Sequence, residues 1–273
     1  MASSKSDKEL AFLRDLYVAT DWGERFAELV DEHVVLPKKG SMLYVAAGTG
    51  GHALAMQERA GNRVTLVCVD ESEESLELGR AKAVAVRAEP EFRRAQLEAL
   101  EFEDDQFDLV VGDASMIAAE RLPEVVAEMV RVAAPGGTVA LTLPTSSSFG
   151  EFFSVYWEAL RNAGIADHEH DVESLITGLP TVSEIEVLAG REGLDNVSSW
   201  TQIEEFDFES GEEFLNAPLI TDFLLRGWLE SLPEAADQER VTKEIERIID
   251  VERQDMDFAL SVKATLVVGR KAR

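Results

Sequence analysis

The feature that most constrains the fold is the alternation of short apolar runs with helical patterns. The runs cover residues 42–51 (MLYVAAGTGG), 64–70 (VTLVCVD), 92–97, 107–113 (FDLVVGD) and 137–143 (GTVALTL). Apolar runs of this length are typical of strands buried on both faces of a parallel sheet. Helical patterns follow at 72–86 and 122–133. The β-α-β-α-β order therefore predicts an α/β protein with a doubly wound, Rossmann-like sheet.

Helical patterns flank this core. Residues 7–35 repeat apolar side chains three and four apart, including Leu10, Leu13 and Tyr17. We therefore expect an N-terminal helical lid over residues 1–40. Helices are also expected at 149–163 and 182–193, a sixth strand at 197–206, and a helical insertion at about 212–254. Alternating apolar residues at 258–268 predict a last strand with one face buried more deeply.

The charge balance limits the partners. The chain has 26 basic and 53 acidic residues, a formal charge of −27. Such an acidic protein would repel a phosphate backbone, so nucleic acid is not expected as a partner. No apolar stretch is long enough for a membrane span and the first residues contain no signal segment, so we expect a cytoplasmic protein that does not bind membranes. The single cysteine, Cys68, lies in an apolar run and is interpreted as a core residue.

A glycine turn follows the first apolar run. Gly48 and Gly50 lie between this strand and a helix, where backbone amides and the positive helix end favour an anionic or carboxylate-bearing ligand. Asp70 ends the second strand, where a carboxylate can accept both hydroxyl hydrogens of a ribose. Together they predict an adenosine cofactor. Gly48, Gly50 and Ala53 also satisfy the dinucleotide pattern G-x-G-x-x-A, so a nicotinamide or flavin oxidoreductase stays open as an alternative.

Four segments carry a family resemblance. They are LYVAAGTG, VDESEESLELGRAKA, ALEFEDDQFDLVVGDASM and EMVRVAAPGGTVALTLPT. In order and spacing they resemble the class I S-adenosylmethionine-dependent methyltransferases, especially the small-molecule group that includes the quinone-biosynthesis enzymes. The resemblance implies a methyltransferase domain over residues 41–273, an antiparallel C-terminal strand and S-adenosylmethionine as cofactor.

The resemblance also implies a set of cofactor-binding residues. Gly48 and Gly50 would approach the methionine part, Asp70 the ribose, and Glu71 the adenosine. The other implied positions are Tyr17 and Trp22 as aromatic cover, Tyr44 and Ala46 in the first motif, Gln96 and Leu97 beside the adenine, and Asp113 near the methionine amino group or the substrate. Tyr44, Ala46 and Gln96 depart from the residues usual in the family. A non-catalytic, methyltransferase-like binding module is therefore a further alternative.

The catalytic residues are less constrained. Methyl transfer from a sulfonium is an in-line displacement with a good leaving group, so positioning of the acceptor supplies most of the catalysis. His168, His170 and Asp113 are candidates for a base, and no metal site is expected. Residues 149–180 and 212–254 are expected to roof the pocket of a small-molecule acceptor. Their aromatic content favours an apolar acceptor or a subunit interface, so a homodimer stays open.

Overall fold

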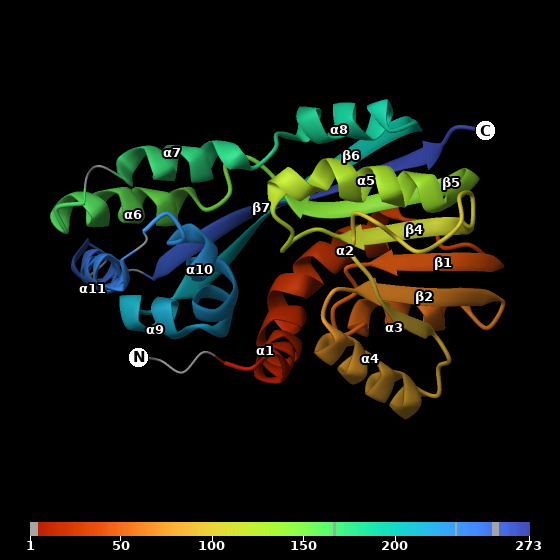
Figure 1. The fold of residues 1–273 in the computed structure, drawn as a ribbon, viewed down its shortest axis with the longest axis horizontal. Helices are drawn as coiled ribbons and strands as arrows, with labels where there is room; N and C mark the ends of the chain where they lie inside the picture. Colours follow the sequence, from red (N-terminus) through yellow and green to blue (C-terminus); the bar gives the residue numbers. More distant parts are fainter. Residues whose placement is uncertain (1–4, 166–167, 233, 253–256) are drawn as a thin grey trace. The chain divides into compact units, whose positions relative to one another are not determined.

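The computed structural model describes residues 5–165, 168–232, 234–252 and 257–273 (Figure 1). The chain forms two compact units. Unit 1 comprises the residues up to Leu143, with Val182–Thr201 and Ala264–Arg273. Unit 2 comprises Pro144–Thr181 and Gln202–Lys263. The N-terminal segment predicted as a lid therefore lies in the same unit as the glycine turn.

A seven-stranded sheet has the order β3-β2-β1-β4-β5-β7-β6. The strands are β1 (Gly40–Val45), β2 (Val64–Asp70), β3 (Glu91–Arg94), β4 (Phe107–Asp113), β5 (Ala133–Pro144), β6 (Leu194–Phe208) and β7 (Phe258–Lys271). The first five strands pair in parallel. The arrow of β7 points the opposite way (Figure 1). This mixed sheet confirms the predicted Rossmann-like fold with an antiparallel C-terminal strand.

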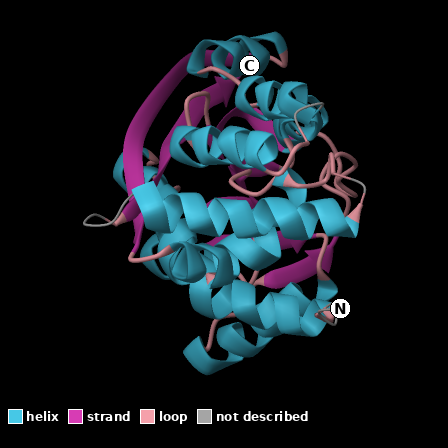
Figure 2. Ribbon diagram, turned by 90° about the vertical axis from the view of Figure 1, so that its left-hand side faces the viewer, coloured by secondary structure: helices cyan, strands magenta, loops and turns pink. Residues whose placement is uncertain are grey.

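Unit 1 has helices before and between its strands, and Figure 2 draws helices in cyan and strands in magenta. The helices are α1 (Asp7–Leu13), η1 (Arg14–Gly23), α2 (Glu24–His33), α3 (Gly51–Ala60), α4 (Glu73–Val86), η2 (Ala119–Arg121), α5 (Leu122–Val132) and α8 (Val182–Arg191). The first three form one continuous helical segment, which begins at a capping box of Ser6 and Glu9. Its middle part, η1, is π-helical, a conformation that is frequent at functional sites.

The central strand β1 is buried on both faces. Leu43 and Val45 pack in a hydrophobic cluster with residues of α5 and α8, including Met129 and Ile185. The side chain of Tyr44 lies on the opposite face of β1, toward α3, where its hydroxyl contacts His52. Successive strand residues alternate in direction, so the continuous apolar run reflects burial against helices on both sides.

Unit 2 contains both segments that were expected to lie near the acceptor. Its helices are α6 (Gly150–Asn162), α7 (Glu169–Gly178), α9 (Gly211–Asn216), η4 (Leu219–Leu224), α10 (Leu225–Trp228) and α11 (Ala235–Glu252). Aromatic rings fill its core, among them Phe152 stacked on Trp228 at a centroid distance of 4.1 Å. The sequence did not predict α7, because its start falls in the polar stretch ADHEHD at residues 166–171. Residues 166–167 of that stretch lie outside the described residues.

Candidate functional site

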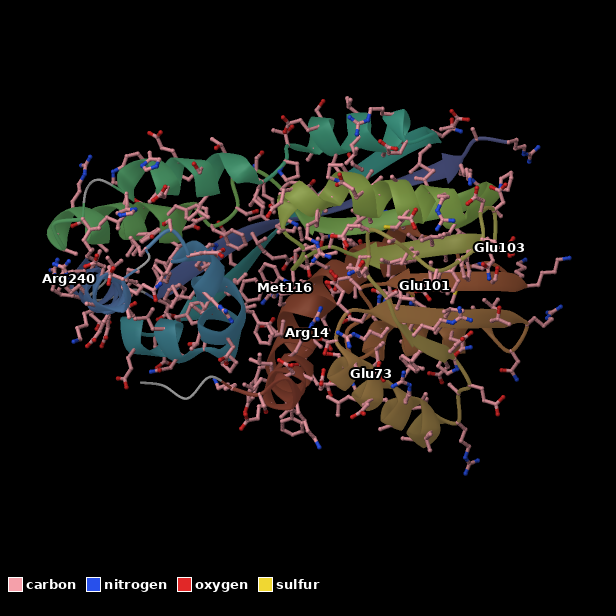
Figure 3. All side chains as sticks on the ribbon, in the orientation of Figure 1. Arg14, Glu73, Glu101, Glu103, Met116 and Arg240 are labelled. Carbon is pink, nitrogen blue, oxygen red and sulfur yellow. The ribbon has the colours of Figure 1, made fainter. Side chains whose placement is uncertain are left out.

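A pocket of about 570 Å³ lies at the glycine turn of unit 1. One wall is the N-terminal helical segment, which contributes residues between Arg14 and Asp31. The opposite wall contains β1, the turn and the start of α3, from Tyr44 to Ala55. Figure 3 shows Arg14 on the helical segment and Met116 in the loop after β4, and both residues line the pocket. The volume suits a small-molecule ligand.

The turn between β1 and α3 is built from left-handed backbone. Gly48 has φ +54° and Gly50 has φ +72°, values that residues with a side chain rarely adopt. A Cβ at Gly50 would also lie 2.9 Å from the ring of Phe92. Ala46 also adopts φ +55°, although it is not glycine. The backbone is therefore left-handed at Ala46 as well as at Gly48 and Gly50.

Asp70 holds this turn in place. Its side chain is buried, with one oxygen accepting a hydrogen bond from the Gly48 N–H at 2.7 Å and the other from the Ser72 N–H at 3.0 Å. Both carboxylate oxygens of Asp70 therefore accept hydrogen bonds from backbone N–H groups of this region. The lining of the pocket, taken over the described residues, includes Gly48 but not Asp70. The contact between Asp70 and a ribose stays a prediction.

Positively charged side chains gather at the turn. The guanidinium carbon of Arg14 lies 3.4 Å from the position of a Cβ on Gly48. Asp15 contacts both the Thr49 hydroxyl and the Lys82 ammonium. These contacts connect the helical segment to the turn and to α4, and they place two cations beside the glycines.

Further along the pocket lies a chain of hydrogen bonds. The Tyr44 hydroxyl lies 2.8 Å from Nδ1 of His52, whose Nε2 lies 2.8 Å from Oδ1 of Asp31. Arg59 also pairs with Asp31. Burial, reinforced by the carboxylate of Asp113, raises the pKa of Tyr44 well above its ordinary value.

The remaining sequence-predicted positions fall in several environments. Asp113 lines the pocket, and its Oδ1 accepts a hydrogen bond from the Ser115 N–H at 3.0 Å. Glu71 pairs with Arg121 at 2.7 Å. Of the others, Gln96 is exposed, Leu97 is buried in the hydrophobic cluster, and Tyr17 is 54% exposed. The structure thus brings Tyr44, Ala46, Gly48 and Asp113 together in the wall of one pocket, whereas Tyr17, Gly50, Glu71, Gln96 and Leu97 do not line it within the described chain.

The two predicted histidine bases both contact one aspartate in unit 2. His168 Nδ1 lies 2.8 Å and His170 Nε2 3.0 Å from carboxylate oxygens of Asp171. Their catalytic role stays a prediction. In the part of the chain that the structure describes, no group of three or more His, Cys, Asp or Glu side chains is arranged to hold a metal ion.

The sequence did not reveal five residues of this site: Arg14, Asp15, Asp31, His52 and Lys82. They come from four separate elements, and no spacing along the chain relates them. The π-helical turns of η1 also interrupt the α-helical repeat from which a sequence pattern predicts the inward-facing side of a helix. A search for polar residues on α3, the helix that follows the glycine turn, would have found His52, but together with Gln57, Glu58 and Arg59.

Comparison with known families decides the nature of this domain. Residues 42–137, which include the glycine turn, β2 and β4, match the family described as a methyltransferase domain. This part of the chain is therefore similar to a methyltransferase domain, in agreement with its sequence resemblance to the S-adenosylmethionine-dependent methyltransferases.

The methyltransferase domain has relatives among quinone-biosynthesis enzymes. Demethylmenaquinone methyltransferase of Shouchella clausii is 32% identical over 124 residues, which cover 44% of this chain and 53% of the relative. The Deinococcus radiodurans enzyme of the same name is 32% identical over 148 residues, 53% of this chain and 60% of the relative. The chain thus spans little more than half the length of these relatives.

Solved structures share the fold of the methyltransferase domain and its surroundings. YcgJ of Bacillus subtilis aligns with a TM-score of 0.60 at 16% identity, covering 92% of this chain and 99% of that one. Phosphoethanolamine N-methyltransferase 2 of Haemonchus contortus, solved with S-adenosylhomocysteine, aligns with a TM-score of 0.57 at 15% identity, covering 100% of this chain and 59% of that one. Among the described helices of the present chain, none has the length and apolar character needed to cross a membrane.

The residues of the pocket fit the cofactor of this family. S-adenosylmethionine carries a carboxylate, an ammonium and a sulfonium. Arg14 and Lys82 supply positive charge at the glycine turn, where a carboxylate is favoured. Asp113, Glu28 and Asp31 supply negative charge elsewhere in the same lining, where cationic groups are favoured.

Proposed function

We propose that this chain is a methyltransferase that uses S-adenosylmethionine and transfers a methyl group to a small molecule by in-line displacement. One observation carries the proposal. The left-handed glycine turn of the methyltransferase domain opens onto a pocket of about 570 Å³ that contains both cationic and anionic side chains. A turn that served only to connect β1 with α3 would not require a charged pocket beside it.

The cofactor, when bound, supplies an electrophilic methyl group on a positively charged sulfur. The protein residues bind and orient it. Gly48 allows close approach of backbone, and the Arg14 guanidinium beside it offers a planar, bidentate partner for a carboxylate. Asp113 at the end of β4 offers a carboxylate to an ammonium.

The acceptor is proposed to be a small, largely apolar molecule. The lining includes Val18, Trp22, Ala27 and Met116, which offer an apolar surface beside the charged groups. Two relatives of the domain are named as methyltransferases of demethylmenaquinone. Because the leaving group is good, holding the acceptor in line with the reacting methyl group supplies most of the rate enhancement.

Ligand binding tests the proposal. A ligand present at 100 times its dissociation constant adds about 2.7 kcal/mol to the free energy of unfolding. We therefore expect a clear increase in melting temperature with S-adenosylhomocysteine and none with NAD or a flavin. An increase with NAD alone would contradict the methyltransferase assignment and favour an oxidoreductase.

A charge variant sharpens the test. Arg14→Gln is expected to weaken S-adenosylhomocysteine binding about tenfold, the scale of one lost hydrogen bond between charged groups. Arg25→Gln is the matched control, because Arg25 pairs with the exposed Asp21 at 2.9 Å and does not line the pocket. Isothermal titration calorimetry measures both affinities. Equal affinities of the two variants would show that the carboxylate is bound elsewhere.

Turnover separates an enzyme from a non-catalytic binding module. Purified protein is incubated with S-adenosylmethionine and a set of hydroquinones and phenols, and formation of S-adenosylhomocysteine is followed. Product that depends on the acceptor supports methyl transfer. Tight cofactor binding with no turnover on any acceptor of this class would favour the binding module.

A further inference from the structure

Three polar side chains from three elements form a line along the pocket. Tyr44 comes from β1, His52 from α3 and Asp31 from α2, and all three line the pocket. The two hydrogen bonds that join them are both 2.8 Å long. The rings of Tyr44 and His52 meet edge to face at a centroid distance of 5.6 Å. The arrangement has the form of an active-site triad, in which one group exchanges a proton, the second relays it and the third orients the second.

The charges define the direction of the hydrogen bonds. Desolvation raises the pKa of Asp31, but hydrogen bonds from Arg59 and His52 outweigh it and leave that pKa below the ordinary value. An ionised carboxylate can only accept, so Nε2 of His52 carries the hydrogen that faces Asp31. In a neutral imidazole Nδ1 is then an acceptor, and Tyr44, which burial keeps protonated, donates to it.

The burial of the three side chains decreases along the line of hydrogen bonds, from Tyr44 through His52 to Asp31. Tyr44 is 7% exposed, whereas the side chains of His52 and Asp31 are 16% and 38% exposed. A proton accepted at the phenol inside the pocket therefore has a hydrogen-bonded route toward solvent. A simple packing contact between β1 and α3 would require neither a carboxylate at the far end nor this gradient of exposure.

We propose that Tyr44, His52 and Asp31 form a proton relay that removes the proton from a weakly acidic hydroxyl of the acceptor, so that the acceptor is a phenol or an enol. The inference rests on the proposed function. A thioether or a tertiary amine has no such proton, so its methylation would not require the relay.

The O–H bond of the acceptor breaks, and its proton passes to the Tyr44 oxygen while the proton of Tyr44 passes to Nδ1 of His52. The acceptor oxygen keeps the electron pair and forms the bond to the methyl carbon, whose former bonding pair stays with the departing sulfur. His52 is left as an imidazolium, stabilised by the Asp31 carboxylate, and it returns the proton to water after the reaction.

Direct observation of the relayed proton tests the proposal. The probe is 4-nitrophenol, an acidic phenol whose ionised form is coloured, added to protein saturated with S-adenosylhomocysteine. Nitrogen NMR of ring-labelled histidine distinguishes neutral imidazole from imidazolium, and a His52→Gln spectrum assigns His52 among the four histidines of the chain. We expect probe binding to convert His52 to imidazolium and to increase the ionised fraction of the bound probe.

Variants separate a relay from a structural contact. In Tyr44→Phe the probe should leave His52 neutral, and the ratio of ionised to neutral bound probe should fall at least tenfold. Asp31→Asn should lower that ratio in the same direction. His33→Gln is the control, because His33 stacks on Trp200 and does not line this pocket within the described chain, and it should behave as the parent protein does.

Other results of these experiments would contradict either the proton relay or the proposed function. A neutral His52 in the parent protein, an unchanged response in Tyr44→Phe, or failure of 4-nitrophenol to bind would each overturn the relay and its phenolic acceptor. Calorimetry on the same samples reports S-adenosylhomocysteine binding. Loss of that binding in the parent protein would overturn the proposed function, whereas normal binding with no relay response overturns only the inference.

Discussion

The two walls of the pocket are built in different ways. The turn wall comes from one contiguous stretch, residues 44–55, and the shape of its glycine turn is set by backbone conformation and by the buried Asp70. The helical wall comes from residues 14–31, and its character is set by side chains that contact distant positions such as Thr49 and His52. The local sequence predicts the conformation of the turn wall, because backbone conformation sets it. The side-chain contacts of the helical wall depend instead on how separate elements pack.

The largest expected effect concerns burial in the helical wall. Trp22 is 1% exposed and its ring lies 5.0 Å from that of Phe26, so Trp22→Ala should lower the free energy of unfolding by about 3–5 kcal/mol. Urea unfolding followed by circular dichroism measures it. Trp200→Ala, at a half-buried position, is the control and should cost less. Similar losses would mean that the helical wall is not anchored by Trp22.

The next effect concerns the turn wall. Asp70→Ala removes the acceptor of two backbone N–H groups, and we expect a loss of about 2–3 kcal/mol in the free energy of unfolding. Asp113→Ala should cost less, because the Asp113 carboxylate accepts a single backbone hydrogen bond, from the Ser115 N–H, among the described contacts. Chemical unfolding of both variants provides the measurement. If Asp70→Ala unfolds as the parent does but loses S-adenosylhomocysteine binding, Asp70 serves the ligand and not the turn.

A smaller effect is expected from backbone strain at the same turn. Gly48→Ala places a side chain at φ +54°, which costs about 1–2 kcal/mol, and its Cβ would lie 3.4 Å from the Arg14 guanidinium. Gly190→Ala is the matched control, since its Cβ would meet nothing within 4 Å and its φ is not left-handed. The control should be neutral or slightly stabilising. A neutral Gly48→Ala would show that the turn can adopt another conformation.

The smallest effect is a pH dependence in the helical wall. Because the folded pKa of Asp31 is lowered, its contribution to stability is present above the ordinary aspartate pKa of about 3.9 and is lost as pH falls through the folded value. The side chain is 38% exposed, so solvent screening limits the contribution to less than about 1 kcal/mol.

Unfolding midpoints measured between pH 7 and pH 3 test the role of Asp31. Asp31→Asn should lose less stability on acidification than the parent, whereas Asp21→Asn, in a more exposed pair with Arg25, should follow the parent more closely. A parent and an Asp31→Asn variant with the same pH dependence would contradict the lowered pKa.

The accuracy of the sequence prediction varied among the strands. The predicted ranges 64–70 and 107–113 are those of β2 and β4, because most residues of both strands are buried and apolar. The third strand was predicted at 92–97 but lies at Glu91–Arg94. It pairs with β2 through only four residues, and Leu97 packs instead into the hydrophobic cluster beyond the strand.

The sequence by itself determined the doubly wound sheet, the glycine turn and the acid at the end of each of two strands. These features are local, since apolar run length, glycine and strand-terminal residues act within a few positions. Only the tertiary structure decided what each acid does. Asp70 is buried and accepts a hydrogen bond from the backbone N–H of Gly48, whereas Asp113 lines the pocket. It also decided that Tyr44, His52 and Asp31 meet, because their contact requires a strand and two helices to pack together, and sequence distance does not encode that packing.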